Sequence, residues 1–198
     1  KNDAESQLKI SQIPGASKAS ANASEDKTLA AILPMFASMH DRLGVANQAT
    51  DSDGIVRKYP LRWAESGYFI PSLVGRTLEN AEINFSQAPD SMALNWRNKR
   101  GKYSRISFGD LVQDQISEAD RAKLNGAFIV LGASAPGIGQ TKPTGVSSLE
   151  DDSEILATAL DDALNDTHLR TMPNWLTLLI NLVIIWGLVW ITMTNVVS

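Results

Sequence analysis

Asp51, Asp53 and Gly54 are the residues of this chain that most resemble a metal site, because Asp-x-Asp-Gly occurs in calcium-binding loops. In such a loop the glycine takes position six, and an acidic residue at position twelve closes the cage. With Gly54 at position six, Ala49 falls at position one and Pro60 at position twelve, so two ligand positions are lost. Asp-Gly between alternating apolar runs is typical of a tight turn instead. We therefore predict a structural turn without a metal.

A second candidate is the glycine-rich stretch "VLGASAPGIGQTKPTG", which follows an apolar run. Gly132 and Gly137 have the spacing of a phosphate-binding P-loop, but Ile138 stands where that motif needs lysine. The dinucleotide motif G-x-G-x-x-G is also absent, because Lys142 follows Gly137 and Gly139 at the third glycine position. A loop at the carboxyl end of a parallel strand is still a natural ligand site. The possible ligand or partner loop comprises Gly132, Ser134, Gly137, Gly139 and Gln140.

Ser134 also invites a catalytic interpretation, because "GASAP" resembles the G-x-S-x-G turn of serine hydrolases. Pro136 replaces the last glycine, and the base would have to be His40 or His168, the only histidines. His40 is predicted on a helix and His168 beside a membrane, so neither suits that role. The chain has no cysteine, which excludes disulfides and thiolate ligands. We predict no catalytic residue, no metal ligand and no cofactor.

A basic and aromatic stretch, "RNKRGKYSR", is the third candidate. Its cations are Arg97, Lys99, Arg100, Lys102 and Arg105. Such a mixture can bind nucleic acid, but the net charge of -4 gives no general support for that partner. A solvated hairpin tip is the commoner cause of such a pattern, and anionic lipid or an acidic protein face would also suit it. It remains a possible contact patch, with no nucleic acid expected.

The run from Trp175 to Val197 contains no charged residue. As a helix it would be roughly 30 Å long, enough to cross a bilayer, whereas a buried core helix of that kind is the alternative. We expect a transmembrane helix over residues 175–197. Arg170, Pro173 and Trp175 mark the membrane junction, and the proline disfavours a helical Met172 before it. We therefore expect the helix to break there.

The remaining patterns predict an α/β fold, a mixed sheet with flanking helices. Apolar spacing predicts a helix from Pro34, and another after Pro71 with Val74, Leu78 and Ala81 inward. A closing helix is predicted from Ser148 to Asn165, with an acidic first turn. Its apolar stripe comprises Ile155, Leu156, Ala159, Leu160, Ala163 and Leu164. "SEADRAKL" predicts a short helix with a serine start.

Strands are predicted on both sides of the Asp-Gly turn, in "GVANQAT" and "IVRKYPLRW", where Pro60 indicates an edge or an irregularity. A hairpin is predicted from "MALNWR" and "YSRISF". The apolar run "AFIVLG" is typical of a buried parallel strand. These helix and strand patterns predict a folded domain over 28–170. The residues before it, 1–27, are predicted to form a linker or mobile segment.

In order along the chain, several segments resemble one family, the second type of the CHASE sensory domains. "LGVANQATDSDGIVRKYPL" is similar to its G-x-x-N…D-x-D-G-x-x-R-x-x-P-L segment, and "LNGAFIVLGASAPGIGQTKP" to its glycine-rich strand and loop. "SEILATALDDALNDTHLRTMPNW" resembles its closing helix and the run into the membrane. The resemblance implies an extracytoplasmic input module joined by membrane helices to a cyclase or kinase.

The chain departs from the family at Gln140, where an aspartate is frequent, and in "EILA", which lacks a histidine. The family's front portion and an output domain are not seen, so we expect a fragment or a chain whose front is processed or encoded separately. We predict a sensory or binding module, not an enzyme, in a bacterial inner membrane, with its domain periplasmic and its C-terminus cytoplasmic. It would contact the bilayer and a protein partner or another copy of itself. A membrane-anchored accessory subunit remains open.

Overall fold

The computed structural model describes residues 5–9, 13–19, 28–32, 41–83, 90–96, 103–133, 139–170 and 172–197. The predicted helix after Pro34 and the tip of the predicted basic hairpin lie outside these ranges, as does the centre of the glycine-rich loop. Most of the predicted linker over 1–27 lies outside them as well. The chain divides into two compact units, Lys1–His168 and Leu169–Ser198, and each is described by itself.

The strands of the first unit are short and form four small antiparallel sheets among the described residues. The strands are β1 (Glu5–Lys9), β2 (Ser17–Lys18), β3 (Thr28–Ile32), β4 (Lys58–Pro60), β5 (Arg62–Glu65), β6 (Tyr68–Pro71), β7 (Ser91–Ala93), β8 (Thr141–Lys142) and β9 (Glu150–Asp151). The sheets pair β1 with β3, β4 with β7 and β8 with β9, while β6 lies between β2 and β5. Within the described ranges, parallel pairing is confined to two isolated bridges, Val45 with Ser72 and Val56 with Thr144.

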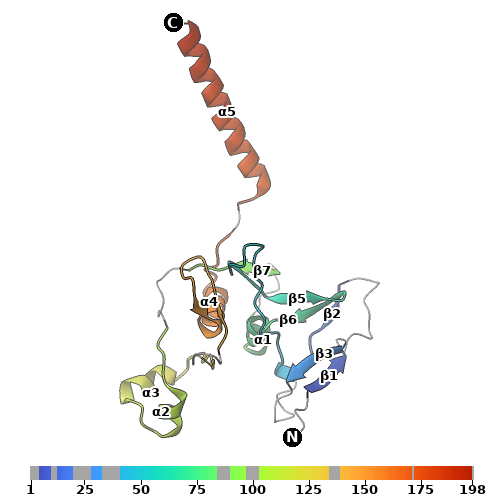
Figure 1. The fold of residues 1–198 in the computed structure, drawn as a ribbon, viewed down its shortest axis with the longest axis vertical. Coiled ribbons are helices and arrows are strands. Elements are labelled where there is room, and N and C mark those ends of the chain that lie inside the picture. The colour runs from blue at the N-terminus through green and yellow to red at the C-terminus, as the bar shows by residue number, and fades with distance from the viewer. Residues whose placement is uncertain are drawn as a thin grey trace. The chain divides into compact units, whose positions relative to one another are not determined.

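The described part of the first unit contains four helices, and Figure 1 labels them along the chain. They are α1 (Leu73–Asn80), α2 (Phe108–Val112), α3 (Glu118–Leu124) and α4 (Asp152–Leu164). The hydroxyls of Ser72, Ser107 and Ser117 each accept a hydrogen bond from a backbone N–H in the first turn of α1, α2 and α3. These caps satisfy donors that have no partner inside a helix, so the serines set where the helices begin. The predicted serine start of "SEADRAKL" is confirmed.

The main core lies where α1 and α4 meet β4 and β7. Its buried residues are Val56, Tyr59, Leu61, Val74, Leu78, Met92, Leu94, Ile155, Ala159 and Leu160. Tyr59 and Met92 are paired across β4 and β7, and burial raises the pKa of the Tyr59 hydroxyl to about 12. Most of the residues predicted to face inward on α1 and α4 are therefore buried in or packed against this core. Ala81 is an exception: it is exposed, because α1 ends at Asn80 and Ala81 forms its C-cap.

The predicted strand pair around the Asp-Gly turn is wrong. The segment after Gly44 lies beside the start of α1 instead, since Val45 N–H donates to the Pro71 carbonyl at 3.0 Å. "IVRKYPLRW" divides at Leu61 into β4, which pairs with β7, and β5, which pairs with β6. Pro60 has no N–H to continue the β4 ladder, so the strand changes partner there, which agrees with the predicted irregularity.

The predicted partner strand "YSRISF" is also wrong, because residues 103–107 form no strand and Phe108 already begins α2. Side chains attach this segment to α4 in place of a backbone ladder. The Tyr103 hydroxyl donates to Asp161 at 3.2 Å, and Arg105 donates to Asp151 and Glu154, each at 2.9 Å. α4 itself begins at Asp152, later than predicted, because Glu150 and Asp151 belong to β9.

"AFIVLG" is not a buried strand. Phe128, Ile129 and Leu131 are 50%, 58% and 73% exposed, and no strand among the described residues pairs with them. The run is apolar enough for a sheet interior, but a sheet interior also needs neighbouring strands. Only Val130 is packed against the main core, as a partly buried residue.

The second unit contains α5 (Asn174–Val197), a single continuous helix drawn in red in Figure 1. Its segment Asn174–Met193 is by length and composition able to cross a membrane, and none of that window is buried. The expected break at Met172 is confirmed, since α4 ends at Leu164 and α5 begins directly after Pro173. The α/β class with one C-terminal apolar helix is thus confirmed.

Candidate functional site

The two described ends of the glycine-rich loop meet at the first turn of α4. A Cβ added to Gly132 would lie 2.4 Å from the Cβ of Ser153, so only glycine allows this approach. At the other end, the Gln140 carbonyl accepts a hydrogen bond from the Asp152 N–H at 3.3 Å. Gly139 is half-buried beside it, whereas Ser134 and Gly137 lie outside the described residues. The start of α4 therefore brings Gly132 and Gln140 together.

Next to Gly132 lies an apolar groove of about 360 Å³, which we call the α2–α3 groove. It is bounded by α2, α3, the segments 103–106 and 127–132, and the first two turns of α4. The apolar side chains that line it include Ile106, Phe108, Leu111, Leu124, Phe128 and Leu131. Cavities of this size and composition are typical of sites for small, largely apolar ligands.

The two cations on the rim of this groove are already paired. Arg105 bridges Asp151 and Glu154, and these carboxylates, Glu154 first, raise the pKa of its guanidinium. Lys123 donates to Asp120 at 2.7 Å and to the Ser104 hydroxyl at 3.3 Å, and it lowers the pKa of Asp120. The groove therefore offers apolar surface more than free positive charge. Arg105 serves within the fold, while Arg97, Lys99, Arg100 and Lys102 lie outside the described residues.

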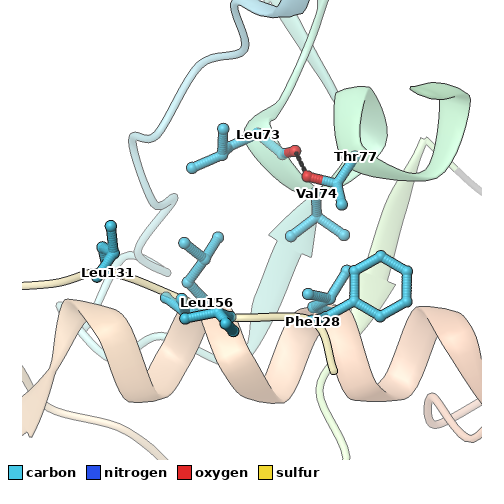
Figure 2. Close-up of a pocket in the computed structure, with 9 residues that line it drawn as sticks. Leu73, Val74, Thr77, Phe128, Leu131 and Leu156 are labelled. Atoms are coloured by element: carbon cyan, nitrogen blue, oxygen red, sulfur yellow. Dashed lines mark hydrogen bonds between the residues drawn. The ribbon is translucent and has the colours of Figure 1, made fainter. Parts of the chain in front are cut away.

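A smaller cavity of about 170 Å³ lies on the other side of the segment Phe128–Leu131. Figure 2 shows this segment crossing α4 near Leu156, with Leu73 and Val74 of α1 across the cavity. The hydroxyl of Thr77 donates to the Leu73 carbonyl at 2.8 Å and so turns away from the cavity. The walls are consequently almost entirely aliphatic and aromatic.

The backbone of residues 128–131 makes no hydrogen bond to any other described residue. An extended, apolar segment with unpaired N–H and C=O groups has the properties of an unprotected sheet edge. It separates the two cavities, so a molecule that entered either cavity would contact it. Sequence patterns identify this segment as apolar, but its exposure follows only from the tertiary structure.

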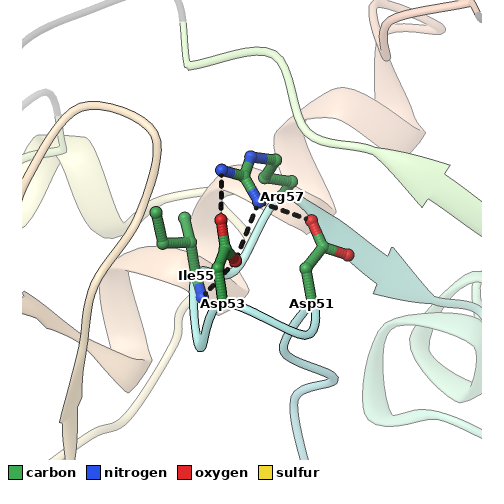
Figure 3. A network of polar contacts seen from close by, with 4 residues as sticks. All are labelled: Asp51, Asp53, Ile55 and Arg57. Carbon is green, nitrogen blue, oxygen red and sulfur yellow. Dashed lines mark hydrogen bonds and ion pairs between the residues drawn. The ribbon is translucent and has the colours of Figure 1, made fainter.

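Asp51 and Asp53 both face Arg57, as Figure 3 shows. The guanidinium donates to Asp51 at 2.8 Å and to both Asp53 oxygens at 3.0 and 2.8 Å, while the Ile55 N–H donates to Asp53 at 3.1 Å. Arg57 accordingly lowers the pKa of Asp53. Gly54 has φ +79°, and its N–H donates to the Asp51 carbonyl at 2.9 Å. This geometry is that of a tight turn closed by an ion pair; that it holds no calcium stays a prediction.

A buried polar network lies where the chain leaves the domain, and the sequence analysis did not identify it. Asp162, only 1% exposed, accepts a hydrogen bond from the Asn95 N–H at 2.7 Å and another from the Thr167 hydroxyl at 3.0 Å. The Asn95 amide in turn donates to the Thr167 carbonyl at 2.8 Å. We call Asn95, Asp162 and Thr167 the exit network. The sequence feature that could have revealed this network is Asp162, an aspartate on the inward face of the amphipathic helix α4.

Beyond the exit network, Pro173 directly precedes α5, and its carbonyl accepts hydrogen bonds from the N–H groups of Leu176 and Thr177 at 3.0 and 3.3 Å. Trp175 is 64% exposed in the first turn. Among the described residues, no group of three or more His, Asp or Glu side chains is placed to hold a metal ion.

The model of the CHASE2 domain matches residues 5–194 of the chain. The chain belongs to the CHASE2 family. CHASE2 domains are extracellular sensory domains of signalling proteins, so this is a sensory domain with a helix long and apolar enough to span a membrane. The resemblance inferred from the ordered sequence segments is confirmed. No curated protein and no solved structure gave a match.

Proposed function

We propose that this CHASE2 chain is the extracytoplasmic input module of a bacterial membrane signalling protein and has no enzymatic activity of its own. Its domain would lie on the periplasmic side of the inner membrane, and α5 would cross the bilayer with its C-terminus in the cytoplasm. The observation that carries this proposal is the family match over a chain in which residues 165–173 alone separate the domain helix α4 from α5.

The input would be an apolar ligand or an apolar protein segment bound in the α2–α3 groove. Its walls are apolar, and the cations on its rim are neutralised by pairing. An occupant would cover Phe128 and Leu131, whose exposure leaves apolar surface to be removed from water. The same occupant would touch the first turns of α4 through Ser153, Glu154 and Ala157.

The output path would run along α4. Its first turn borders the groove, and near its last turn Asp162 binds Asn95 and Thr167. A displacement of α4 would strain this exit network and move the residues that lead to Asn174. A ligand can shift such an equilibrium only if it binds the two positions of α4 with different affinities.

A flexible insertion tests the path. Four residues, Gly-Ser-Gly-Ser, are inserted after Thr171 in the full-length signalling protein, and the same insertion after Gly145, in the exposed connection between β8 and β9, serves as the control. We expect the Thr171 insertion to abolish the response of the output to the stimulus while the domain stays folded. Unchanged signalling would contradict transmission through this joint and favour the accessory-subunit alternative, in which α5 is only an anchor.

A further inference from the structure

Up to Met193, the polar side chains of α5 lie on one side of the helix. At about 100° per residue, Asn174, Thr177, Asn181 and Thr192 all fall within roughly 60° of one another. At the same angular step the tryptophans of the helix, Trp175, Trp186 and Trp190, cluster roughly 160° away. The helix therefore has a polar stripe and, opposite to it, a tryptophan stripe, although it carries no charge.

Asn181 is the member of the polar stripe that needs a partner most. Thr192 satisfies its hydroxyl on its own helix, donating to the carbonyls of Leu188 and Val189 at 3.0 and 2.8 Å. An asparagine amide has two donors and a two-lone-pair acceptor, and Asn181 makes no hydrogen bond within the described chain. Within hydrocarbon there is no water to satisfy it, so a second helix must supply the partner.

We propose that α5 associates in the membrane with α5 of a second copy of this chain, with Asn181 bonded to Asn181 across the interface. Copies inserted in the same orientation hold Asn181 at the same depth, and a carboxamide is complementary to itself because it both donates and accepts. A two-fold axis along the membrane normal then lets each amide donate one hydrogen bond and accept one in the same contact. The bulky tryptophans face lipid on the outer side of the pair.

This inference rests on the proposed function, because α5 must span the membrane for Asn181 to lie in hydrocarbon. It names the partner of α5 as the same helix of a second copy. Two paired α5 helices would hold two sensory domains next to each other, each connected through its own residues 165–173. A change in the path from α4 would then alter the crossing or rotation of the pair.

Site-directed disulfide formation tests the interface in the full chain, which has no native cysteine. Leu188→Cys places a thiol roughly 20° from Asn181 on the helix surface, and Val183→Cys places one roughly 160° away as the control. After mild oxidation of native membranes, we expect a disulfide-linked dimer from Leu188→Cys and little from Val183→Cys. Adding Asn181→Leu to Leu188→Cys should lower the dimer-to-monomer ratio about threefold or more, whereas Asn181→Gln should largely preserve it.

Each chain is also washed with alkaline carbonate, which separates failure of the anchor from failure of the interface. Two results would overturn the interface alone in a chain that stays in the membrane. One is equal disulfide-linked dimer from Leu188→Cys and Val183→Cys, and the other is dimer from Leu188→Cys that Asn181→Leu does not reduce. An adduct of Leu188→Cys with a different polypeptide overturns the second copy as the partner. A chain that the wash releases overturns both this inference and the membrane anchoring of the proposed function.

Discussion

The main core around α1 and α4 and the segment 103–133 are held in place by different interactions. In the core, ten apolar side chains from four separate stretches of chain are removed from water. In the segment 103–133 neither α2 nor α3 has a buried residue, and the polar contacts of this segment are helix caps, ion pairs and side-chain hydrogen bonds. Burial stabilises more than exposed ion pairs do, so we expect the α2–α3 side to be displaced more easily than the main core.

Two isoleucines give the largest test of this contrast. Ile155 is fully buried in the core, whereas Ile129 is 58% exposed. Ile155→Ala should lower the free energy of unfolding by about 3 kcal/mol, because it leaves a cavity, and Ile129→Ala should lower it by about 0.5 kcal/mol or less. Denaturant unfolding of the detergent-solubilised chain measures both. Equal losses of unfolding free energy would mean that Ile129 is buried too, and that the main core and the segment 103–133 do not differ in this way.

The exit network gives the next largest effect. Asp162→Ala should lower the free energy of unfolding by about 2 kcal/mol, because it leaves the Asn95 N–H without its acceptor. Asp161→Ala is the matched control; Asp161 is only half-buried, so its loss should matter less. Hydrogen exchange at the Asn95 amide should accelerate in Asp162→Ala alone. An unchanged exchange rate would show that this bond does not protect the exit.

Two glycines should respond with opposite signs. Gly54→Ala places a side chain at φ +79° and should lower the free energy of unfolding by about 1 kcal/mol, although the site is open. Gly109 lies inside α2, and its nearest obstacle to a new Cβ is the Ser107 hydroxyl at 3.6 Å. Gly109→Ala should therefore raise stability by up to about 1 kcal/mol through helix propensity. Thermal unfolding of both variants checks the two signs, and a loss for Gly109→Ala would contradict a helical α2.

The smallest effect concerns Asp53, whose folded-state pKa is lowered by Arg57. A lowered pKa means that the ion pair contributes stability above the unfolded-state value near 4, and that this contribution is lost as pH falls through the folded-state pKa. A carboxyl-carbon NMR titration should give Asp53 a midpoint below that of an unperturbed aspartate. In Arg57→Gln the midpoint should return toward the ordinary value; no change would show that the pair does not form.

Short-range patterns predicted much of this molecule. The uncharged run alone predicts α5, because length and composition decide whether a helix can cross a bilayer. Ser117 predicts the start of α3, and Asp53-Gly54 predicts a turn, because both act on backbone groups a few residues away. The order of loose motifs predicted the CHASE2 family. The roles assigned to Gly132, Gln140 and the basic patch stay predictions.

The tertiary structure alone decided which apolar segments find partners. "AFIVLG" has the composition of an interior strand, yet it lies exposed, and no strand among the described residues pairs with it. "YSRISF" alternates like a strand, yet Arg105 and Tyr103 attach it to acids on α4 and on the residue preceding it. Asp162 is buried, and one of its hydrogen-bond donors is the N–H of Asn95, far away in sequence. Strand pairing and burial join residues distant along the chain, and a local pattern holds no information about which distant residue arrives.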